Sequence, residues 1–213
     1  MLANFFRRPS GVGSSLNVYM FTPGHLWRSA KLLCREPRYF VDRLGVLAYQ
    51  LLHPADPWLT REAIATIDRY LTRDMRGFEW GSGRSTAWLA RRLGFLVSVE
   101  DDARWYEEVR ARLQGLNVDY RYVPRTTGNY ARQIDAFPDG SFDFVLVDGS
   151  ARDACVAAAA GKVKVGGMIA IDNADLDIDV SPLADFECTK TSNGVWRTDL
   201  FRRRTRAGDG ERA

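Results

Sequence analysis

Hydrophobic and polar residues follow two different rhythms along the chain, and the change falls near Thr60. In residues 25–58, apolar side chains recur at helical spacing, and the pattern is broken at Pro37. This predicts two short amphipathic helices, because proline interrupts a helical run. Residues 1–24 carry proline and glycine at short intervals and therefore predict a loose arm.

From Thr60 onward, short apolar runs alternate with amphipathic segments. Thr60 is a predicted helix cap, with Glu62 in the first turn of that helix. The predicted strands cover residues 77–80, 95–100, 118–123, 142–148 and 166–172, and the predicted helices between them include 85–92, 103–114 and 153–163. Runs such as "FDFVLVD" are apolar almost throughout, as is typical of a strand buried on both faces. The alternation predicts a doubly wound, mostly parallel Rossmann-like α/β sheet.

The last part of the chain has a different pattern. The segment "FECTKTSNGVWRTDLFRR" predicts two strands joined around Asn193 and Gly194, which form an antiparallel hairpin at the sheet edge. We therefore expect an N-terminal helical arm or cap over residues 1–57, a ligand-binding domain over 58–205 and a disordered tail over 206–213.

Composition limits the class of protein. The chain has 213 residues, of which 46% are hydrophobic and 27% charged, and this is enough to bury a core in one domain with an appendage. Its three cysteines are widely spaced, which argues against a disulfide framework or a zinc site. No apolar run approaches the roughly 20 residues that span a bilayer, and no signal-peptide pattern is present at the start. We therefore expect a cytoplasmic protein.

Basic residues outnumber acidic residues in the N-terminal arm, although the net charge of the whole chain is only +3. The arm's acidic residues, Glu36, Asp42 and Asp56, are outnumbered by Arg7, Arg8, Arg28, Lys31, Arg35, Arg38 and Arg43. This pattern indicates a helical cap with a solvated basic face. A substrate lid and a weak peripheral contact with a membrane surface are the alternatives.

A glycine turn follows the strand expected at 77–80, with Gly81 and Gly83 leading into a helix. A triphosphate-binding loop would need a Gly-Lys-Ser/Thr sequence, which is absent here. A nicotinamide dinucleotide would favour glycine at the position of Thr86, and the carboxylate of Glu79 would lie close to its two phosphates. The turn therefore does not have the charge that a phosphate ligand requires.

S-adenosylmethionine suits this turn better, because it carries a sulfonium and an ammonium group and no phosphate. A carboxylate at Glu79 would attract that positive charge. Glu100 ends the strand expected at 95–100, where an acidic residue can accept hydrogen bonds from both ribose hydroxyls. Glu100 thus indicates an adenosine ribose, and Glu79 favours S-adenosylmethionine over a dinucleotide.

Four segments carry a family resemblance: "FEWGSGRST", "VSVE", "FDFVLVDG" and "GGMIAIDN". In this order they resemble motifs of the class I S-adenosylmethionine-dependent methyltransferases, and in detail the chain is similar to small O-methyltransferase-like members over residues 58–203. The resemblance implies that the cofactor is bound by Glu79, Gly81, Ser82, Gly83, Ser85, Glu100, Asp101 and Asp148. It also places residues 128–130 near adenine, although "RTTGNYARQID" lacks the acidic residue that usually binds this base. For Ser82 and Ser85, simple turn and helix-cap chemistry is the alternative.

Asp148, Asp172 and Asn173 follow the two buried strands expected at 142–148 and 166–172, so they should lie in one crevice. Asp148 is expected to position the acceptor or the cofactor's ammonium group, with capping of the next helix as its alternative. Arg152 is expected to pair either with an acidic substrate group or with Asp148 itself. These four residues are the candidate catalytic residues.

The same crevice is also a candidate site for a divalent metal ion. Asp148, Asp172 and Asn173 resemble the oxygen ligands of the divalent-metal-dependent catechol-type O-methyltransferases, and such ligands suit Mg²⁺. The segment "VDGSARDAC" departs from that family around the first ligand. Metal dependence therefore remains an open alternative.

These observations together predict an S-adenosylmethionine-dependent methyltransferase that acts on oxygen in a small-molecule or sugar-like acceptor. His53 is a further candidate base, and Trp58 and Tyr130 are candidate pocket walls. The alternatives are a nucleic-acid methyltransferase, a nicotinamide-dependent oxidoreductase and a non-catalytic cofactor-binding module. The oligomeric state is not predicted.

Overall fold

The computed structural model describes residues 37–204, and the chain divides into two units, residues 1–52 and 53–213. The expected loose arm, the first of the two expected N-terminal helices and the expected tail at 206–213 lie outside the described residues. The described part of the first unit is helix α2 (Pro37–Leu52), which begins at the proline that interrupts the sequence pattern. This is the second of the two expected N-terminal helices.

The second unit alternates strands and helices almost as expected. Its helices are α3 (Arg61–Tyr70), α4 (Arg84–Ala90), α5 (Ala103–Arg110) and α6 (Arg152–Ala159), and its 3-10 turns are η2 (Arg125–Thr127), η3 (Ala131–Ala136) and η4 (Ser181–Leu183). Its strands are β1 (Arg76–Trp80), β2 (Phe95–Glu100), β3 (Val118–Tyr122), β4 (Phe142–Val147), β5 (Val163–Asp172), β6 (Phe186–Ser192) and β7 (Arg197–Arg203).

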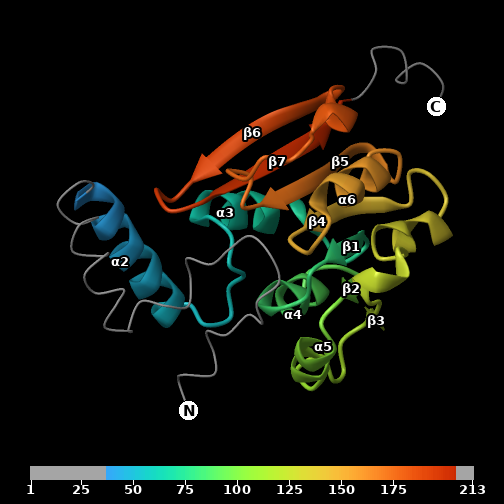
Figure 1. Cartoon of the computed structure of the whole chain (residues 1–213), viewed down its shortest axis with the longest axis horizontal. Coiled ribbons are helices and arrows are strands. Elements are labelled where there is room, and N and C mark those ends of the chain that lie inside the picture. The colour runs from blue at the N-terminus through green and yellow to red at the C-terminus, as the bar shows by residue number, and fades with distance from the viewer. Residues whose placement is uncertain (1–36, 205–213) are drawn as a thin grey trace. The chain divides into compact units, whose positions relative to one another are not determined.

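The strands form one seven-stranded sheet in the order β3-β2-β1-β4-β5-β7-β6 (Figure 1). Strands β1 to β5 run parallel, whereas β7 is antiparallel to both β5 and β6. The predicted fold class is therefore confirmed, including the C-terminal hairpin. The strand order reverses between β1 and β4, and in open sheets of this kind ligands bind outside the carboxyl ends of the strands at that point.

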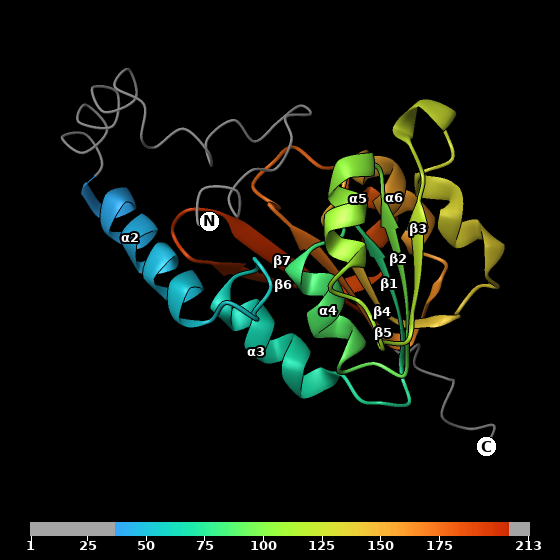
Figure 2. The same ribbon diagram turned by 90° about the horizontal axis from the view of Figure 1, so that it is seen from below.

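Helices cover both faces of the sheet. Helices α3, α4 and α5 lie on one face, and α6 and η3 lie on the other (Figure 2). The core on the second face contains Phe78 and Trp80 of β1, Ile134 of η3 and Val156 of α6, all of them fully buried. Alternate residues of β1 point to opposite faces, so Glu79 must lie on the face covered by α4.

A buried threonine network fixes α3 against the hairpin. Thr60 caps α3 through its side chain, as predicted, and its hydroxyl contacts the hydroxyl of Thr191 on β6. Its backbone N–H donates to Thr198 Oγ1 on β7 at 3.2 Å, and that hydroxyl donates to Asp172 Oδ1 at 2.9 Å. The carboxylate of Asp172 therefore holds the end of β5 to this network.

Three predicted helix ends were too late. Helix α4 ends at Ala90 rather than 92, α5 at Arg110 rather than 114, and α6 at Ala159 rather than 163. After α6, the backbone carbonyls of Gly161 and Lys162 accept hydrogen bonds from Gly140 and Phe142, each at 3.0 Å. Pairing with a distant segment thus takes these residues out of the helix and starts β5 early.

Candidate cofactor-binding site

The site is built around a close approach of two backbone turns, one after β1 and one after β4. Gly81 has a φ of +88°, and a side chain there would place Cβ 2.5 Å from the backbone nitrogen of Gly149. A side chain at Gly149 would in turn collide with the hydroxyl of Tyr130. Both positions require glycine, since neither has room for a Cβ atom. We call the contact between Gly81 and Gly149 the glycine seam.

Glu79 lies beneath the glycine turn and is fully buried. Its Oε2 accepts hydrogen bonds from Ser98 Oγ at 2.6 Å and from Thr86 Oγ1 at 2.7 Å. Ser98 is the register partner of Glu79 on the neighbouring strand β2, and Thr86 lies in α4. Thr86, the residue that departs from the dinucleotide pattern, therefore serves as a partner of the carboxylate.

The second oxygen of Glu79 is in a different situation. Among residues 37–204, none donates a hydrogen bond to the buried Oε1. The Ser85 hydroxyl lies close by and favours the ionised form, as do Ser98 and Thr86, yet burial outweighs them and raises the pKa of Glu79 to about 7. A buried carboxylate with an unsatisfied oxygen is costly, and a cation nearby would reduce that cost.

The carboxylate of Glu100 lies at the end of β2 and has a full set of donors. Oε2 accepts from the backbone N–H and the hydroxyl of Ser82, at 2.9 and 2.7 Å. Oε1 accepts from the backbone N–H groups of Asp101 and Asp102, each at 3.0 Å. Burial raises the pKa of Glu100, although these donors favour its ionised form. Glu100 thus lies where the sequence placed it, in contact with the turn expected to hold a cofactor.

Two aromatic residues that were not identified from the sequence complete this part of the site. Trp105 of α5 donates from Nε1 to the backbone oxygen of Ser82 at 2.7 Å. The hydroxyl of Tyr120 on β3 lies 2.6 Å from Ser82 Oγ. Trp105 and Tyr120 belong to segments that only the tertiary fold brings to the turn, so their sequence positions gave no signal.

The expected adenine region contains an ion pair. Asp101 Oδ2 lies 2.6 Å from Arg125 Nε, so this carboxylate already has a cationic partner. Gly128 and Asn129 are exposed, whereas Tyr130 is buried, and its backbone oxygen accepts from Trp80 Nε1 at 3.1 Å. Tyr130 is therefore part of the core beneath the glycine seam rather than an open pocket wall.

At the ends of β4 and β5, Arg152 connects the loops. Its guanidinium donates to the backbone oxygens of Gly149, Asp148 and Asp172 at 3.1, 3.2 and 2.8 Å. It also lies 3.4 Å from Asp148 Oδ1 and 3.4 Å from Asn173 Oδ1. Of the two expected roles for Arg152, the structure therefore shows the pairing with Asp148. The N-cap residue of α6 is Ala151, which makes no side-chain cap.

The residues proposed as metal ligands do not fit a divalent cation in this arrangement. The guanidinium of Arg152 already contacts Asp148 and Asn173, and its positive charge would repel a metal ion there. Asp172 turns one oxygen to Thr198, and Asn173 sits in a left-handed backbone conformation with φ of +49°. Apart from this set, which includes an asparagine, residues 37–204 contain no group of three or more His, Cys, Asp or Glu side chains that could hold a metal ion.

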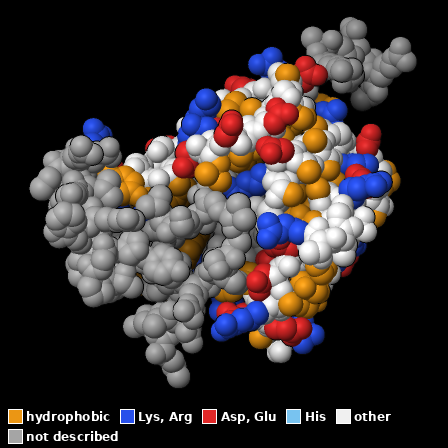
Figure 3. Space-filling model, viewed as in Figure 1, with side chains coloured by type: hydrophobic (Ala, Val, Ile, Leu, Met, Phe, Trp, Pro, Cys, Tyr) orange, Lys and Arg blue, Asp and Glu red, His pale blue; other side chains and the backbone are white. Residues whose placement is uncertain are grey.

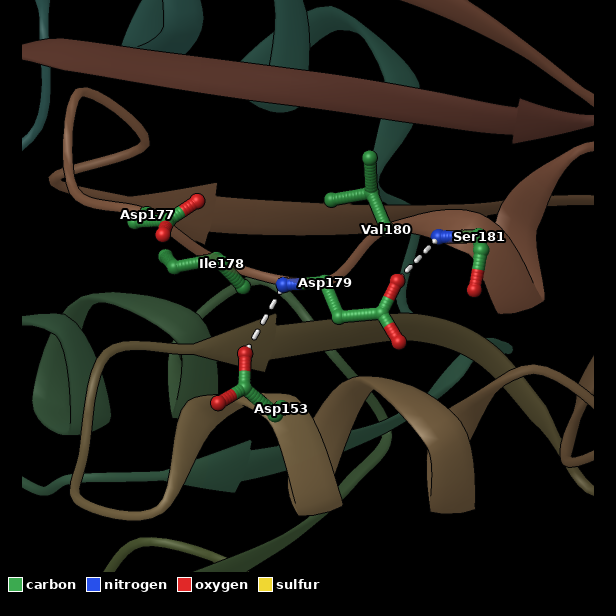
Figure 4. A pocket seen from close by; sticks show the side chains of 6 residues that line it. All are labelled: Asp153, Asp177, Ile178, Asp179, Val180 and Ser181. Atoms are coloured by element: carbon green, nitrogen blue, oxygen red, sulfur yellow. Dashed lines mark hydrogen bonds between the residues drawn. The ribbon is translucent and has the colours of Figure 1, made fainter.

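A surface pocket of about 500 Å³ lies between the start of α6 and the segment that follows β5 (Figure 4). Its acidic residues brace the loop: Asp153 Oδ1 accepts from the Asp179 N–H at 2.8 Å, and Asp179 Oδ1 accepts from the Ser181 N–H at 2.9 Å. Asp177, Ile178 and Val180 complete the lining. Asp153 and Asp179 thus each use one carboxylate oxygen to hold the backbone of the loop.

The sequence also indicated Ser85 as a cofactor contact, His53 as a base and Trp58 as a pocket wall. Ser85 is buried in the first turn of α4, beside Glu79. His53 is exposed, and its Nδ1 lies 3.8 Å from Asp56 Oδ2. The ring of Trp58 lies 5.5 Å from the guanidinium carbon of Arg84 in α4. The structure thus places Ser85 beside Glu79, Trp58 near Arg84 at the start of α4, and His53 beside Asp56.

Comparison with known proteins shows the fold. No known family profile and no curated sequence matches the chain. Among solved structures, the O-methyltransferase TomG from Streptomyces achromogenes, which was solved in complex with SAM, is 22% identical with a TM-score of 0.51, over 66% of this chain and 77% of that one. Precorrin-6y C5,15-methyltransferase from Geobacter metallireducens is 16% identical with a TM-score of 0.51, over 67% and 87%.

An rRNA methylase from Streptococcus thermophilus is also similar, at 11% identity and a TM-score of 0.53, over 66% of this chain and 94% of that one. Identities this low establish shared architecture rather than shared activity. The chain has the fold of the class I S-adenosylmethionine-dependent methyltransferases, and the resemblance seen in its sequence motifs is confirmed at that level.

Proposed function

We propose that residues 58–205 form an S-adenosylmethionine-binding domain that transfers a methyl group to an oxygen of a small-molecule or sugar-like acceptor. The observation that carries the proposal is the buried carboxylate of Glu79, whose Oε1 has no hydrogen-bond donor among the described residues. Thr86 connects it to the glycine turn, because Thr86 Oγ1 donates to Glu79 Oε2 and accepts from the Gly83 N–H. A cationic ligand on that turn would stabilise the ionised carboxylate, whereas a pyrophosphate would not.

The other groups of the site would contact different parts of the ligand. Glu100, held in position by the Ser82 N–H, would bind the ribose side of the ligand, and the glycine seam would let the ligand approach the backbone closely. Bound S-adenosylmethionine would supply an electrophilic methyl group. Arg152 would keep the Asp148 carboxylate at the end of β4 in a fixed position, where it could orient the acceptor or receive its proton.

Calorimetry with the purified protein tests cofactor binding. We expect micromolar binding of S-adenosylmethionine and its loss in Glu100→Ala, because that variant removes the acceptor for the ribose hydroxyls. Glu79→Gln should weaken S-adenosylmethionine binding roughly tenfold or more, since a charge-assisted interaction is lost. S-adenosylhomocysteine, which lacks the sulfonium charge, should be affected less by the same variant.

The result that overturns the proposal is stabilisation of the protein by NADH together with no response to S-adenosylmethionine. That outcome would support the nicotinamide-dependent oxidoreductase. Cofactor binding without methyl transfer to any acceptor in a cell extract would support the non-catalytic module. A cytoplasmic location, expected from the cysteine pattern, is part of the proposal and can be checked by fractionation.

The structure offers little for the nucleic-acid alternative. Arg202 lies with its guanidinium 4.5 Å from the ring of Tyr70, and Arg203 donates to the backbone oxygen of Val163. These arginines of the "FRRR" segment are therefore engaged within the protein. On the face seen in Figure 3, positive and negative side chains of the described residues are interspersed. Salt-dependent binding to RNA would revive this alternative.

Within the described residues, no helix has the length and apolar character needed to cross a membrane. The expected weak membrane contact of the basic arm involves mainly residues before Pro37, outside those described. It remains part of the proposal, together with the helical cap over residues 1–57.

A further inference from the structure

The carboxylate of Glu100 has no acceptor position left for a ligand. A carboxylate has about four acceptor positions. All four are taken, by the hydroxyl of Ser82 and by the N–H groups of Ser82, Asp101 and Asp102. The side chain of Glu100 is also buried, so solvent does not supply the donors. A diol that donates to this carboxylate must therefore replace one of these donors.

Only one of the four donors can leave without moving the backbone. Three of them are N–H groups of the main chain. At Ser82 the main chain is held on both sides, because its N–H donates to Glu100 and its carbonyl oxygen accepts from Trp105 Nε1 at 2.7 Å. The Ser82 hydroxyl, in contrast, can turn about a single bond.

This hydroxyl also has a second partner within reach. Ser82 Oγ lies 2.7 Å from Glu100 Oε2 and 2.6 Å from the Tyr120 hydroxyl. An ionised carboxylate only accepts, so the hydroxyl donates to Glu100 and accepts from Tyr120. If it turns its proton to Tyr120, one acceptor position on Glu100 becomes available and the hydroxyl keeps a partner.

Tyr120 is held in place for this role. Its ring stacks on that of Tyr106, with ring centroids 4.5 Å apart and an interplanar angle of 20°. Burial raises the pKa of Tyr120, so its hydroxyl remains protonated at ordinary pH and can both donate and accept. Because its ring stacks on Tyr106, the position of Tyr120 does not depend on a ligand.

We infer that the Ser82 hydroxyl is an internal competitor for Glu100, that a nucleoside's 2′,3′-diol displaces it, and that Tyr120 determines affinity as the alternative partner of the displaced hydroxyl. This inference rests on the proposed function, since it concerns the ribose of the same ligand. A hydroxyl that bound the nucleoside directly would raise its affinity, whereas the Ser82 hydroxyl lowers the affinity because it competes for Glu100. Tyr120 is accordingly a positioning residue that acts only through Ser82.

The test compares a ligand that has the diol with one that lacks it. Calorimetry would measure the binding of adenosine and of 2′,3′-dideoxyadenosine to the wild-type protein and to the variants Ser82→Ala and Tyr120→Phe. Ser82→Ala should bind adenosine about threefold to tenfold more tightly, because one hydrogen bond no longer competes. Tyr120→Phe should bind it more weakly by a similar factor. Neither variant should change binding of the dideoxy compound.

A double variant separates competition from a structural effect. If Tyr120 acts only through Ser82, the variant that carries both substitutions should match Ser82→Ala alone. Tyr106→Phe is the matched control, since it keeps the stacked ring, and it should bind adenosine like the wild type. Thermal unfolding of each variant would confirm that all are folded under the conditions of the titration.

The outcomes distinguish the two proposals. If the wild-type protein binds neither adenosine nor S-adenosylmethionine, the proposed function fails and the inference fails with it. If it binds them but Ser82→Ala weakens adenosine binding, leaves it unchanged or alters both ligands equally, the competition is disproved while the proposed function stands.

Discussion

The two sides of the glycine seam use carboxylates in different ways. On the β1–β2 side, Glu79 is fully buried with one oxygen lacking a donor, and its pKa is raised to about 7 by burial. On the β4–β5 side, Asp148 faces the guanidinium of Arg152, and Asp172 is bound to Thr198. The first arrangement leaves negative charge uncompensated, whereas the second compensates it within the protein. This difference is the reason why we propose a cationic ligand beside Glu79.

The largest expected effect comes from breaking the seam itself. Gly81→Ala and Gly149→Ala should each lower the free energy of unfolding by about 2–4 kcal/mol, because a Cβ would press on backbone or on the Tyr130 hydroxyl. Urea denaturation measures this. Gly83→Ala is the control: its Cβ would meet nothing within 4 Å, so its loss should stay below about 1 kcal/mol. Equal losses at the three positions would disprove the close approach.

Removing the Arg152 guanidinium would take the cationic partner away from Asp148, so that the β4–β5 side resembles the β1–β2 side. Arg152→Met should lower the free energy of unfolding by about 2–4 kcal/mol, because Asp148 loses its cationic partner and three backbone oxygens lose a donor. Denaturant unfolding would measure the loss. Adding Asp148→Asn should restore part of it, since the uncompensated charge is then removed. If the double variant is less stable than Arg152→Met, charge compensation is not the reason for the loss.

The ionisation of Glu79 should appear in the pH dependence of stability. Its pKa is about 7 in the folded protein against an ordinary value of 4.5, so the folded state holds an extra proton between these values. The Glu79 contribution to stability should therefore fall as pH rises from about 4.5 to 7, by about 3 kcal/mol at most, and stay level above. Unfolding measured at several pH values would show this decrease in the wild type but not in Glu79→Gln. Identical profiles for the two proteins would contradict it.

The smallest effect is expected at Asp172. Asp172→Asn keeps an oxygen that can accept from Thr198, so stability should change by only about 1 kcal/mol. The same variant reports on the metal question: if Mg²⁺ raises the melting temperature of the wild type but not of Asp172→Asn, the conclusion that these residues do not fit a metal is wrong.

Much of the fold followed from local pattern. The strand at Phe95–Glu100 and the cap at Thr60 were predicted at the positions found, since apolar runs and capping side chains act over a few residues. The end of α6 was not predicted, because Gly140 and Phe142 pair with residues that the local pattern assigns to the helix. Glu79 and Glu100 were identified as site residues from strand ends and charge. The Glu79 partners Thr86 and Ser98, and the Ser82 partners Trp105 and Tyr120, were not.

The sequence by itself determined the order of strands and helices, the need for glycine after β1 and the presence of acidic residues at the ends of β1, β2, β4 and β5. These features depend on local periodicity and on residue type. Only the tertiary structure decided which acidic residue has a partner. Parallel pairing sets Ser98 beside Glu79, and the β5–β7 pairing sets Thr198 beside Asp172. Charge compensation depends on distances of a few ångströms between segments far apart in the chain, and the fold alone sets those distances.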